Sequence, residues 1–198
     1  STHMPTTKPP IIGLAGPAGC GKDSVRSVLE LQHEFAGISF ADPMRDMIRT
    51  LLVSTGSSDE YITRRDLKEK PIPGLGVSYR HMAQTLGTEW GRQCLHAEFW
   101  LRTAHNTLAF LRGQGYRNFV ISDVRFANEA EWVRNQGGEI WLLDRSGIAP
   151  VREHVSEAMP FTADRIIHNH GRLSDLQRTV FDALALARAW NSLQGASA

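Results

Sequence analysis

The sequence predicts an α/β fold in which a parallel sheet of five strands carries helices on both faces. Short apolar segments alternate with longer segments of helical periodicity along most of the chain. The 198 residues are 41% hydrophobic and 22% charged, as in ordinary globular proteins and unlike disordered or fibrous chains. Because strand–helix–strand units in one sheet cross over in the right-handed sense, this alternation indicates parallel strands between two helical layers.

Five short apolar segments are the predicted strands. The first is bounded by Pro10 and Gly16, which is typical of a short buried strand. The full set is 11–15, 37–40, 118–122, 139–143 and 164–168. Ligands in parallel sheets bind at the carboxyl ends of the strands, so polar residues that follow these segments are the candidates for a site.

The predicted helices connect these strands and follow the last one. They cover 23–34, a segment from 42 to about 52, 80–93, 97–112, 126–136 and a segment from 174 onward. Asp42 is expected to cap the second helix, with Pro43 at its first position, and Ser174 to cap the last. Apolar side chains of the last helix are expected to face inward: Leu176, Val180, Phe181 and Leu184.

Two connections are long enough to be functional. Residues 54–80 are rich in Ser, Gly, Pro and charge, and we expect an excursion over about 54–95 that covers a site. The connection at about 145–163 is expected to be a short lid. We expect residues 1–3, ahead of Met4, to be an expression scar and 4–198 to be a single domain.

Membrane and metal-cluster classes are disfavoured by the sequence. No apolar segment approaches the ~20 residues that a membrane span needs. The two cysteines form no CxxC pair, and no His/Cys cluster has zinc spacing. Because the sequence shows no signal peptide, we expect a cytoplasmic protein with two free thiols.

Residues 16–24, GPAGCGKDS, match the phosphate-binding loop GxxxxGK (the P-loop) directly after the first strand. In this motif backbone N–H groups surround phosphate oxygens, the helix that follows adds its positive end, and the lysine reaches the β and γ phosphates. Two interpretations stay open for Asp23, which stands where Ser or Thr usually contacts Mg²⁺: a metal ligand helped by Ser24, or a helix cap. The predicted phosphate-binding residues are Gly16, Ala18, Gly19, Cys20 (through its backbone), Gly21, Lys22, Asp23 and Ser24.

Several P-loop protein classes fit this chain poorly. It has no NKxD element, which argues against a GTPase, and it is too short for most ATPase machines. Its formal charge of +1 argues against a stable complex with nucleic acid. Small-molecule kinases remain, because they bind ATP and an acceptor under a mobile, arginine-bearing lid.

The segments SFADPMRDMI, QTLGTEWGR, ISDVRFANE, HVSE and IIHNHG resemble the deoxynucleoside monophosphate kinases of bacteriophages, in order from about residue 11 to 180. The Asp after the loop lysine is typical of that family. The resemblance implies a three-layer P-loop kinase fold and Mg²⁺-dependent transfer of the γ-phosphoryl of ATP to a deoxynucleoside 5′-monophosphate, giving the diphosphate. It also implies, in many members, a homodimer, and the host cytoplasm as the location if the chain is phage-encoded.

Two alternative functions stay open. The IIHNHG segment also resembles dephospho-coenzyme A kinase, so that metabolite or another one is a possible acceptor. A non-catalytic ATP-binding sensor module is the other alternative. The excursion and the lid argue against the sensor, because a sensor does not need two phosphate clamps.

Catalytic candidates follow the predicted strands. Asp123 ends the third strand, where a carboxylate holds the water shell of a metal, and Arg125 is placed to reach the transferred phosphate. Asp23 and Asp123 are thus the predicted metal ligands. For Asp42 a role toward the acceptor phosphate and a role as helix cap both stay open. Arg45 is either a clamp on the substrate phosphate or a solvated side chain.

The predicted lid carries Arg145, Arg152 and His154. Arginines there would neutralise charge that develops on the γ-phosphoryl, and Arg145 is counted with the catalytic candidates. His154 belongs to the HVSE segment of the resemblance, although a lone His is more often structural.

The acceptor is expected to bind residues of the excursion, together with Arg45 before it and Asn128 after it. Arg80 is the best candidate among its arginines, which include Arg64, and Trp90 either stacks on a base or belongs to the core, where Trp100 is expected. Asn128 and Glu129 are either substrate contacts or helix caps. The predicted substrate-binding residues are Arg45, Arg65, Arg80, Gln84, Thr88, Glu89, Trp90, Arg92 and Asn128.

Overall fold

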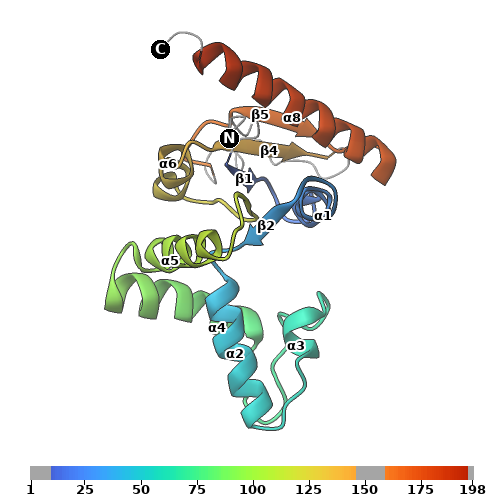
Figure 1. Cartoon of the computed structure of the whole chain (residues 1–198). Helices are drawn as coiled ribbons and strands as arrows, with labels where there is room; N and C mark the ends of the chain where they lie inside the picture. Colours follow the sequence, from blue (N-terminus) through green and yellow to red (C-terminus); the bar gives the residue numbers. More distant parts are fainter. Residues whose placement is uncertain (1–9, 146–158, 196–198) are drawn as a thin grey trace. The chain divides into compact units, whose positions relative to one another are not determined.

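The computed structural model describes residues 10–145 and 159–195 (Figure 1). The chain forms two compact units. Unit 1 contains the residues up to Ile38 together with those from Leu108 onward, and unit 2 contains Ser39–Thr107. Unit 1 holds the sheet and unit 2 is helical.

The sheet of unit 1 has five parallel strands in the order β2-β3-β1-β4-β5, which confirms the predicted fold class. The strands are β1 (Ile11–Ala15), β2 (Phe35–Ile38), β3 (Asn118–Ile121), β4 (Glu139–Asp144) and β5 (Arg165–His168). The predicted range of β2 was two residues too late. Phe35 is a buried core residue that pairs with Asn118, and the strand already ends at Ile38.

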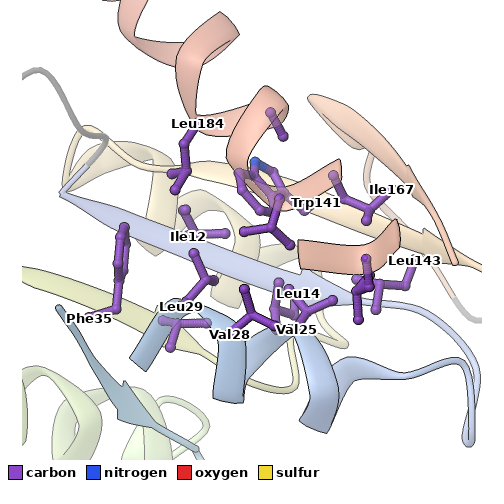
Figure 2. Close-up of a cluster of buried hydrophobic side chains, with 14 of the residues drawn as sticks. Ile12, Leu14, Val25, Val28, Leu29, Phe35, Trp141, Leu143, Ile167 and Leu184 are labelled. Atoms are coloured by element: carbon purple, nitrogen blue, oxygen red, sulfur yellow. The ribbon is translucent and has the colours of Figure 1, made fainter. Parts of the chain in front are cut away.

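Two helices, α1 (Lys22–His33) and α8 (Leu173–Gly195), pack against each other and cover one face of the sheet (Figure 1). Figure 2 shows the core between them, where Trp141 lies among aliphatic side chains from β1, α1 and α8. Fully burying side chains of this size stabilises a fold by about 1.5–3 kcal/mol each. The members of this core include Ile12, Leu14, Val25, Val28, Leu29, Trp141, Leu176, Val180 and Leu184.

Two sequence predictions for α8 were wrong. Phe181 is 60% exposed, because the buried stripe runs through Leu176, Val180 and Leu184 and Phe181 lies one position around the helix from it. Ser174 is not the cap, since the helix already begins at Leu173. The Asp175 carboxylate instead accepts a hydrogen bond from the backbone N–H of Arg172 at 2.8 Å.

The other face of the sheet is covered by α6 (Ala127–Asn135). Val133 of this helix lies over Gly13 of β1, beside Val124 and Ile140. A Cβ on Gly13 would lie 2.8 Å from the side chains of Val124 and Ile140 and 3.4 Å from that of Val133, so the glycine makes room for the packing beneath α6. Helical layers therefore lie on both faces, as the alternation of segments predicts.

Unit 2 is built from helices and turns around its own small core. Its elements are α2 (Asp42–Ser54), α3 (Glu60–Thr63), α4 (Tyr79–Gln84), the π-helix η1 (Thr85–Leu95) and α5 (Phe99–Gly113), whose residues from Leu108 onward belong to unit 1. The core side chains are Ile48, Leu52, Ile62, Ile72 and Tyr79. No helix among the described residues is long and apolar enough to cross a membrane.

The sequence predicts one regular helix over 80–93, but the helix widens into a π-helix at Thr85. Its packing against Trp100 gives a physical reason. The indole Nε1 of Trp100 donates to the carbonyl oxygen of Gly87 at 2.8 Å, and the ring lies directly over Gly91. A Cβ on Gly91 would be 2.5 Å from that nitrogen. π-helical turns are rare and occur often at functional sites, which draws attention to this segment.

Candidate active site

The loop between β1 and α1 takes a path that depends on its glycines. Gly16, Gly19 and Gly21 have φ angles of 141°, 78° and 100°, a region that side-chain-bearing residues rarely adopt. A Cβ on Gly16 would also be 2.9 Å from the sulfur of Cys20 and 3.0 Å from the carbonyl oxygen of Leu143. The glycines of the predicted P-loop therefore fix its shape.

The loop leaves backbone donors available at the start of α1. The N–H of Cys20 donates to the carbonyl of Pro17 at 3.3 Å and so closes the turn. Within residues 10–145 and 159–195, no protein oxygen accepts from the N–H groups of Gly19, Gly21 and Asp23. Unpaired N–H groups at a helix start, together with the positive end of the helix dipole, form an anion-binding site.

Three predicted catalytic side chains form a connected chain beside this loop. The ammonium of Lys22 donates to the carbonyl oxygen of Gly16 at 2.6 Å and lies 3.6 Å from Oδ1 of Asp123. Oδ2 of the same carboxylate accepts from Nε of Arg125 at 3.0 Å. This hydrogen bond and the carboxylate charge raise the pKa of Arg125. The strand end thus carries one carboxylate between two cations, as expected for the edge of a parallel sheet.

Glu129 holds the turn that carries Arg125. Its side chain is buried, and Oε1 accepts from the backbone N–H groups of Arg125 at 2.9 Å and Phe126 at 3.0 Å. Of the two interpretations for Glu129, the structure supports the helix cap. Asn128, one residue before it, is partly exposed at the start of α6.

Two residues from distant parts of the sequence hold the loop from outside. Nη1 of Arg145, just after β4, donates to the carbonyl oxygen of Gly19 at 3.4 Å. Nδ2 of Asn169, just after β5, donates to the carbonyl oxygen of Cys20 at 3.1 Å. No role was predicted for Asn169, although its position directly after a predicted strand was an available signal. Arg152 and His154 lie outside the described residues.

The side chains at the start of α1 divide by burial. Asp23 and Ser24 are exposed, whereas Cys20 is fully buried. Burial raises the pKa of the Cys20 thiol, which keeps it neutral near pH 7 despite the nearby Lys22. A neutral buried thiol is neither a nucleophile nor an anion ligand, so only the backbone of Cys20 is available to a phosphate.

In unit 2, Asp42 is the first residue of α2 rather than its cap, which corrects the sequence prediction. One carboxylate oxygen accepts from the backbone N–H of Ser39 at 3.0 Å, and the other accepts from Nη1 of Arg45 at 3.1 Å. The carboxylate reaches back to close the turn before the helix, while Ala41 occupies the cap position without a side-chain hydrogen bond. Asp42 and Arg45 therefore form a pair at the start of α2.

The arginines of the excursion pair locally. Arg64 binds Asp66 through two hydrogen bonds of 3.1 and 2.7 Å, which lower the pKa of the Asp66 carboxyl and raise that of Arg64. Arg80 lies 3.3 Å from Glu69. Arg65 is exposed.

Unit 2 contains an apolar cavity of about 530 Å³ between α2, α4 and η1. Two predicted acceptor residues, Glu89 and Trp90, line it, whereas Gln84, Thr88 and Arg92 do not. Trp90 is 38% exposed and packs edge-on against Phe99, so it is not a core residue. Trp100 is buried, as expected. The cavity lining consists of Met47, Ile48, Leu51, Met82, Thr85, Leu86, Glu89, Trp90 and Cys94.

Comparison with known proteins decides the family. The family of deoxynucleotide monophosphate kinases matches residues 73–180. A protein of Acanthamoeba polyphaga mimivirus that carries the same name is 32% identical over 162 residues, which cover 74% of this chain and 80% of the relative. The chain belongs to the deoxynucleotide monophosphate kinase family.

Two further likenesses accompany this family membership. The deoxynucleoside-5′-monophosphate kinase of Escherichia phage T5 is 40% identical over 67 residues, which cover 34% of this chain and 26% of that protein. A solved dephospho-CoA kinase from Campylobacter jejuni is 11% identical, with a TM-score of 0.49, and the match covers 91% of this chain and 98% of that one. The second likeness is too weak to say anything about the substrate.

Membership of the deoxynucleotide monophosphate kinase family confirms the resemblance that the sequence segments indicated. The chain is a nucleotide kinase, an enzyme that transfers a phosphoryl group from a nucleotide donor. The family match includes η1, β3, β4 and β5. It therefore spans Asp123, Arg125 and the part of the unit 2 cavity formed by η1.

Proposed function

We propose that this kinase uses ATP and Mg²⁺ to phosphorylate a deoxynucleoside 5′-monophosphate, giving the diphosphate. The observation that carries the proposal is the glycine loop with unpaired N–H groups that ends in Lys22, beside the carboxylate of Asp123. This arrangement suits a chain of phosphates better than any other common ligand, because it offers fixed backbone donors and one mobile cation to successive anionic groups.

On the donor side, we assign the phosphates of ATP to residues 16–24. In the structure the ammonium of Lys22 donates to the carbonyl of Gly16 and pairs with the carboxylate of Asp123. A β- or γ-phosphate oxygen is a stronger acceptor for an ammonium than a neutral carbonyl is, so the lysine would turn to the nucleotide when it binds. Arg145 and Asn169 act through the loop, because each holds one of its carbonyl oxygens.

The residues present fit Mg²⁺ held mainly by the nucleotide. Mg²⁺ usually keeps several waters and is bound by one or two carboxylates together with phosphate oxygens. Asp123 is a partly exposed carboxylate two residues after β3, and Asp23 is an exposed one in the first turn of α1. When bound, the metal would neutralise charge on the β and γ phosphates. We assign the metal's water shell to Asp123, with Asp23 as the second candidate.

The protein's own part in the reaction is positioning and charge stabilisation. The loop orients the phosphates, and Lys22 follows the charge as it develops on the transferred group. Arg125 stays charged and is largely exposed, and within the described residues its guanidinium is held by Asp123, so it can turn toward a transferred phosphoryl. No covalent intermediate on the protein is needed, because the acceptor phosphate is itself the nucleophile.

On the acceptor side, we assign the monophosphate to unit 2. The pair Asp42–Arg45 offers a guanidinium that could exchange its carboxylate for a substrate phosphate. Glu89 and Trp90 line the cavity and supply a carboxylate acceptor and a flat apolar surface for a base. The other proposed acceptor contacts are Arg65, Arg80, Gln84, Thr88, Arg92 and Asn128.

A coupled ADP-release assay across dAMP, dCMP, dGMP and dTMP tests the proposal. We expect Mg²⁺-dependent turnover with at least one of the four, and little with dephospho-coenzyme A. Turnover with dephospho-coenzyme A alone would transfer the assignment to that class of acceptor. Stabilisation by ATP without acceptor-dependent ADP release from folded protein would refute the kinase assignment and favour a sensor.

A further inference from the structure

A group of metal-binding side chains lies at the carboxyl ends of β4 and β5, outside the residues assigned to the reaction. Nδ1 of His168 is 3.2 Å from Oδ2 of Asp144, and Nε2 of His170 is 3.4 Å from the same oxygen. The three ligand atoms lie within 4.8 Å of one another, and no other such group of three occurs among the described residues.

The backbone places these side chains together. Asp144 and His168 are register partners in adjacent parallel strands, so they lie side by side at the same level of the sheet. The N–H of Asn169 donates to the carbonyl of Asp144 at 2.7 Å, which continues the pairing one residue beyond β5. His168 and His170 are two residues apart in this extended segment, so they project to the same side and their rings stack at 5.5 Å.

The distances are those of ligand atoms around a tetrahedral ion. Zn²⁺ binds imidazole nitrogen and carboxylate oxygen at about 2.0–2.2 Å, so the ligand atoms of a tetrahedral site are about 3.4 Å apart. The two His–Asp separations, 3.2 and 3.4 Å, are those of a hydrogen bond and an ion pair, and they are also close to that edge. Two imidazoles and one carboxylate are a donor set that prefers Zn²⁺ or a similar first-row ion over Mg²⁺ or Ca²⁺.

We propose that Asp144, His168 and His170 form a site for Zn²⁺ or a similar divalent first-row ion, with the fourth position open to water or an anionic ligand. The side chains are 44%, 63% and 41% exposed, so an ion reaches them directly from solvent. The proposal does not depend on the identity of the acceptor, since these residues take no part in the assigned reaction.

The site also borders the phosphate loop. Asn169, which lies between the two histidines, donates to the carbonyl oxygen of Cys20, and Arg145, which follows Asp144, donates to that of Gly19. An ion that fixes His168 and His170 would therefore also hold the segment that supports the loop. The ion would therefore act on the proposed nucleotide site through this segment.

Calorimetric titration of the full chain with Zn²⁺, in a buffer free of chelators, tests the site. We expect one ion per chain with a dissociation constant in the micromolar range or below. Co²⁺ serves as a spectroscopic substitute and should give the strong visible absorption of a tetrahedral site. The variants His168→Asn and His170→Asn should each weaken binding of either ion at least tenfold.

Two control variants separate this site from other histidines. His3→Asn removes the histidine nearest the amino terminus, and His81→Asn removes an exposed histidine of α4; neither should change the affinity. Circular dichroism of each variant checks that it folds like the unaltered chain. Equal Zn²⁺ binding by His168→Asn, His170→Asn and the unaltered chain, or saturation only at millimolar Zn²⁺, would overturn the proposal.

Discussion

The phosphate loop of unit 1 and the π-helix of unit 2 are both shaped by glycines, but the two glycine sets do different work. Gly16, Gly19 and Gly21 adopt backbone angles that other residues avoid, and the GxxxxGK motif to which they belong indicates phosphate binding. Gly91 has helical geometry and is needed only because Trp100 lies directly over it. The role of the loop glycines can be predicted from the sequence, whereas the role of Gly91 depends on a tertiary contact with Trp100.

The same difference separates the surroundings of the two regions. The loop leads to a chain of charged side chains, Lys22, Asp123 and Arg125, whereas the π-helix borders an apolar cavity with a single charged lining residue, Glu89. Charges in the first region suit phosphates, and the apolar lining of the second suits a flat base. Substitutions in the loop should therefore change catalysis, and those in the π-helix should change folding or acceptor affinity.

The largest expected effect is in the loop. Lys22→Ala should reduce turnover about 10²–10³-fold, since it removes a cation from the charge that develops during transfer. Its side chain is partly exposed, and among the described residues its ammonium bonds to Gly16 and Asp123, neither of which belongs to the hydrophobic core, so folding should persist. Steady-state kinetics measures the loss of turnover, and circular dichroism checks the folding of the variant.

Arg117→Ala is the matched control for Lys22→Ala, because it removes an exposed cation of unit 1 that lies just before β3 and has no assigned role. It should leave turnover unchanged. Near-native activity of Lys22→Ala, with the control equally active, would remove the loop from the catalytic site and with it the contrast between the two regions.

Arg125→Ala should have the next largest effect. A charged hydrogen bond is worth about 1.5–3 kcal/mol, so we expect a loss of about 10–100-fold in kcat with little change in the KM for ATP. Arg125→Lys keeps the charge and should recover part of the loss. A rise in the KM for ATP with kcat unchanged would instead identify Arg125 as a binding residue.

The parts of the fold that follow local rules could be predicted, and those that depend on distant contacts could not. All five strands and the P-loop follow from hydrophobic pattern and glycine spacing, and Asp123 with Arg125 follows from the rule about strand ends. Asn169 escaped prediction because its partner, Cys20, is 149 residues away. The π-helix escaped because an indole hydrogen bond to Gly87 leaves no periodic signal.

Gly91→Ala sharpens the comparison from the side of unit 2. The added methyl group would meet the indole of Trp100 at 2.5–2.7 Å, and overpacking of this kind costs about 1–3 kcal/mol. Urea denaturation should show a lower midpoint concentration for Gly91→Ala than for the unaltered chain. Gly113→Ala is the control, since its Cβ meets nothing within 4 Å, and it should leave the midpoint unchanged or raise the unfolding free energy by up to about 1 kcal/mol. Equal midpoints for the two variants would mean that Trp100 does not pack on Gly91.

The smallest effect distinguishes the two regions by their cysteines, one in each. Cys20 of the loop is fully buried and its thiol pKa is raised, so its reactive thiolate forms only at a higher pH than for an ordinary thiol. Cys94 is exposed on η1 and lines the cavity. Iodoacetamide at pH 8 should therefore modify native protein at Cys94 alone and denatured protein at both positions, as measured by peptide mass spectrometry.

Labelling Cys94 should raise the KM for the monophosphate and leave that for ATP unchanged, because the adduct would occupy the proposed acceptor cavity. If Cys20 were labelled as fully as Cys94 in the native protein, the loop would open to solvent, contrary to the fixed shape that its glycines give it.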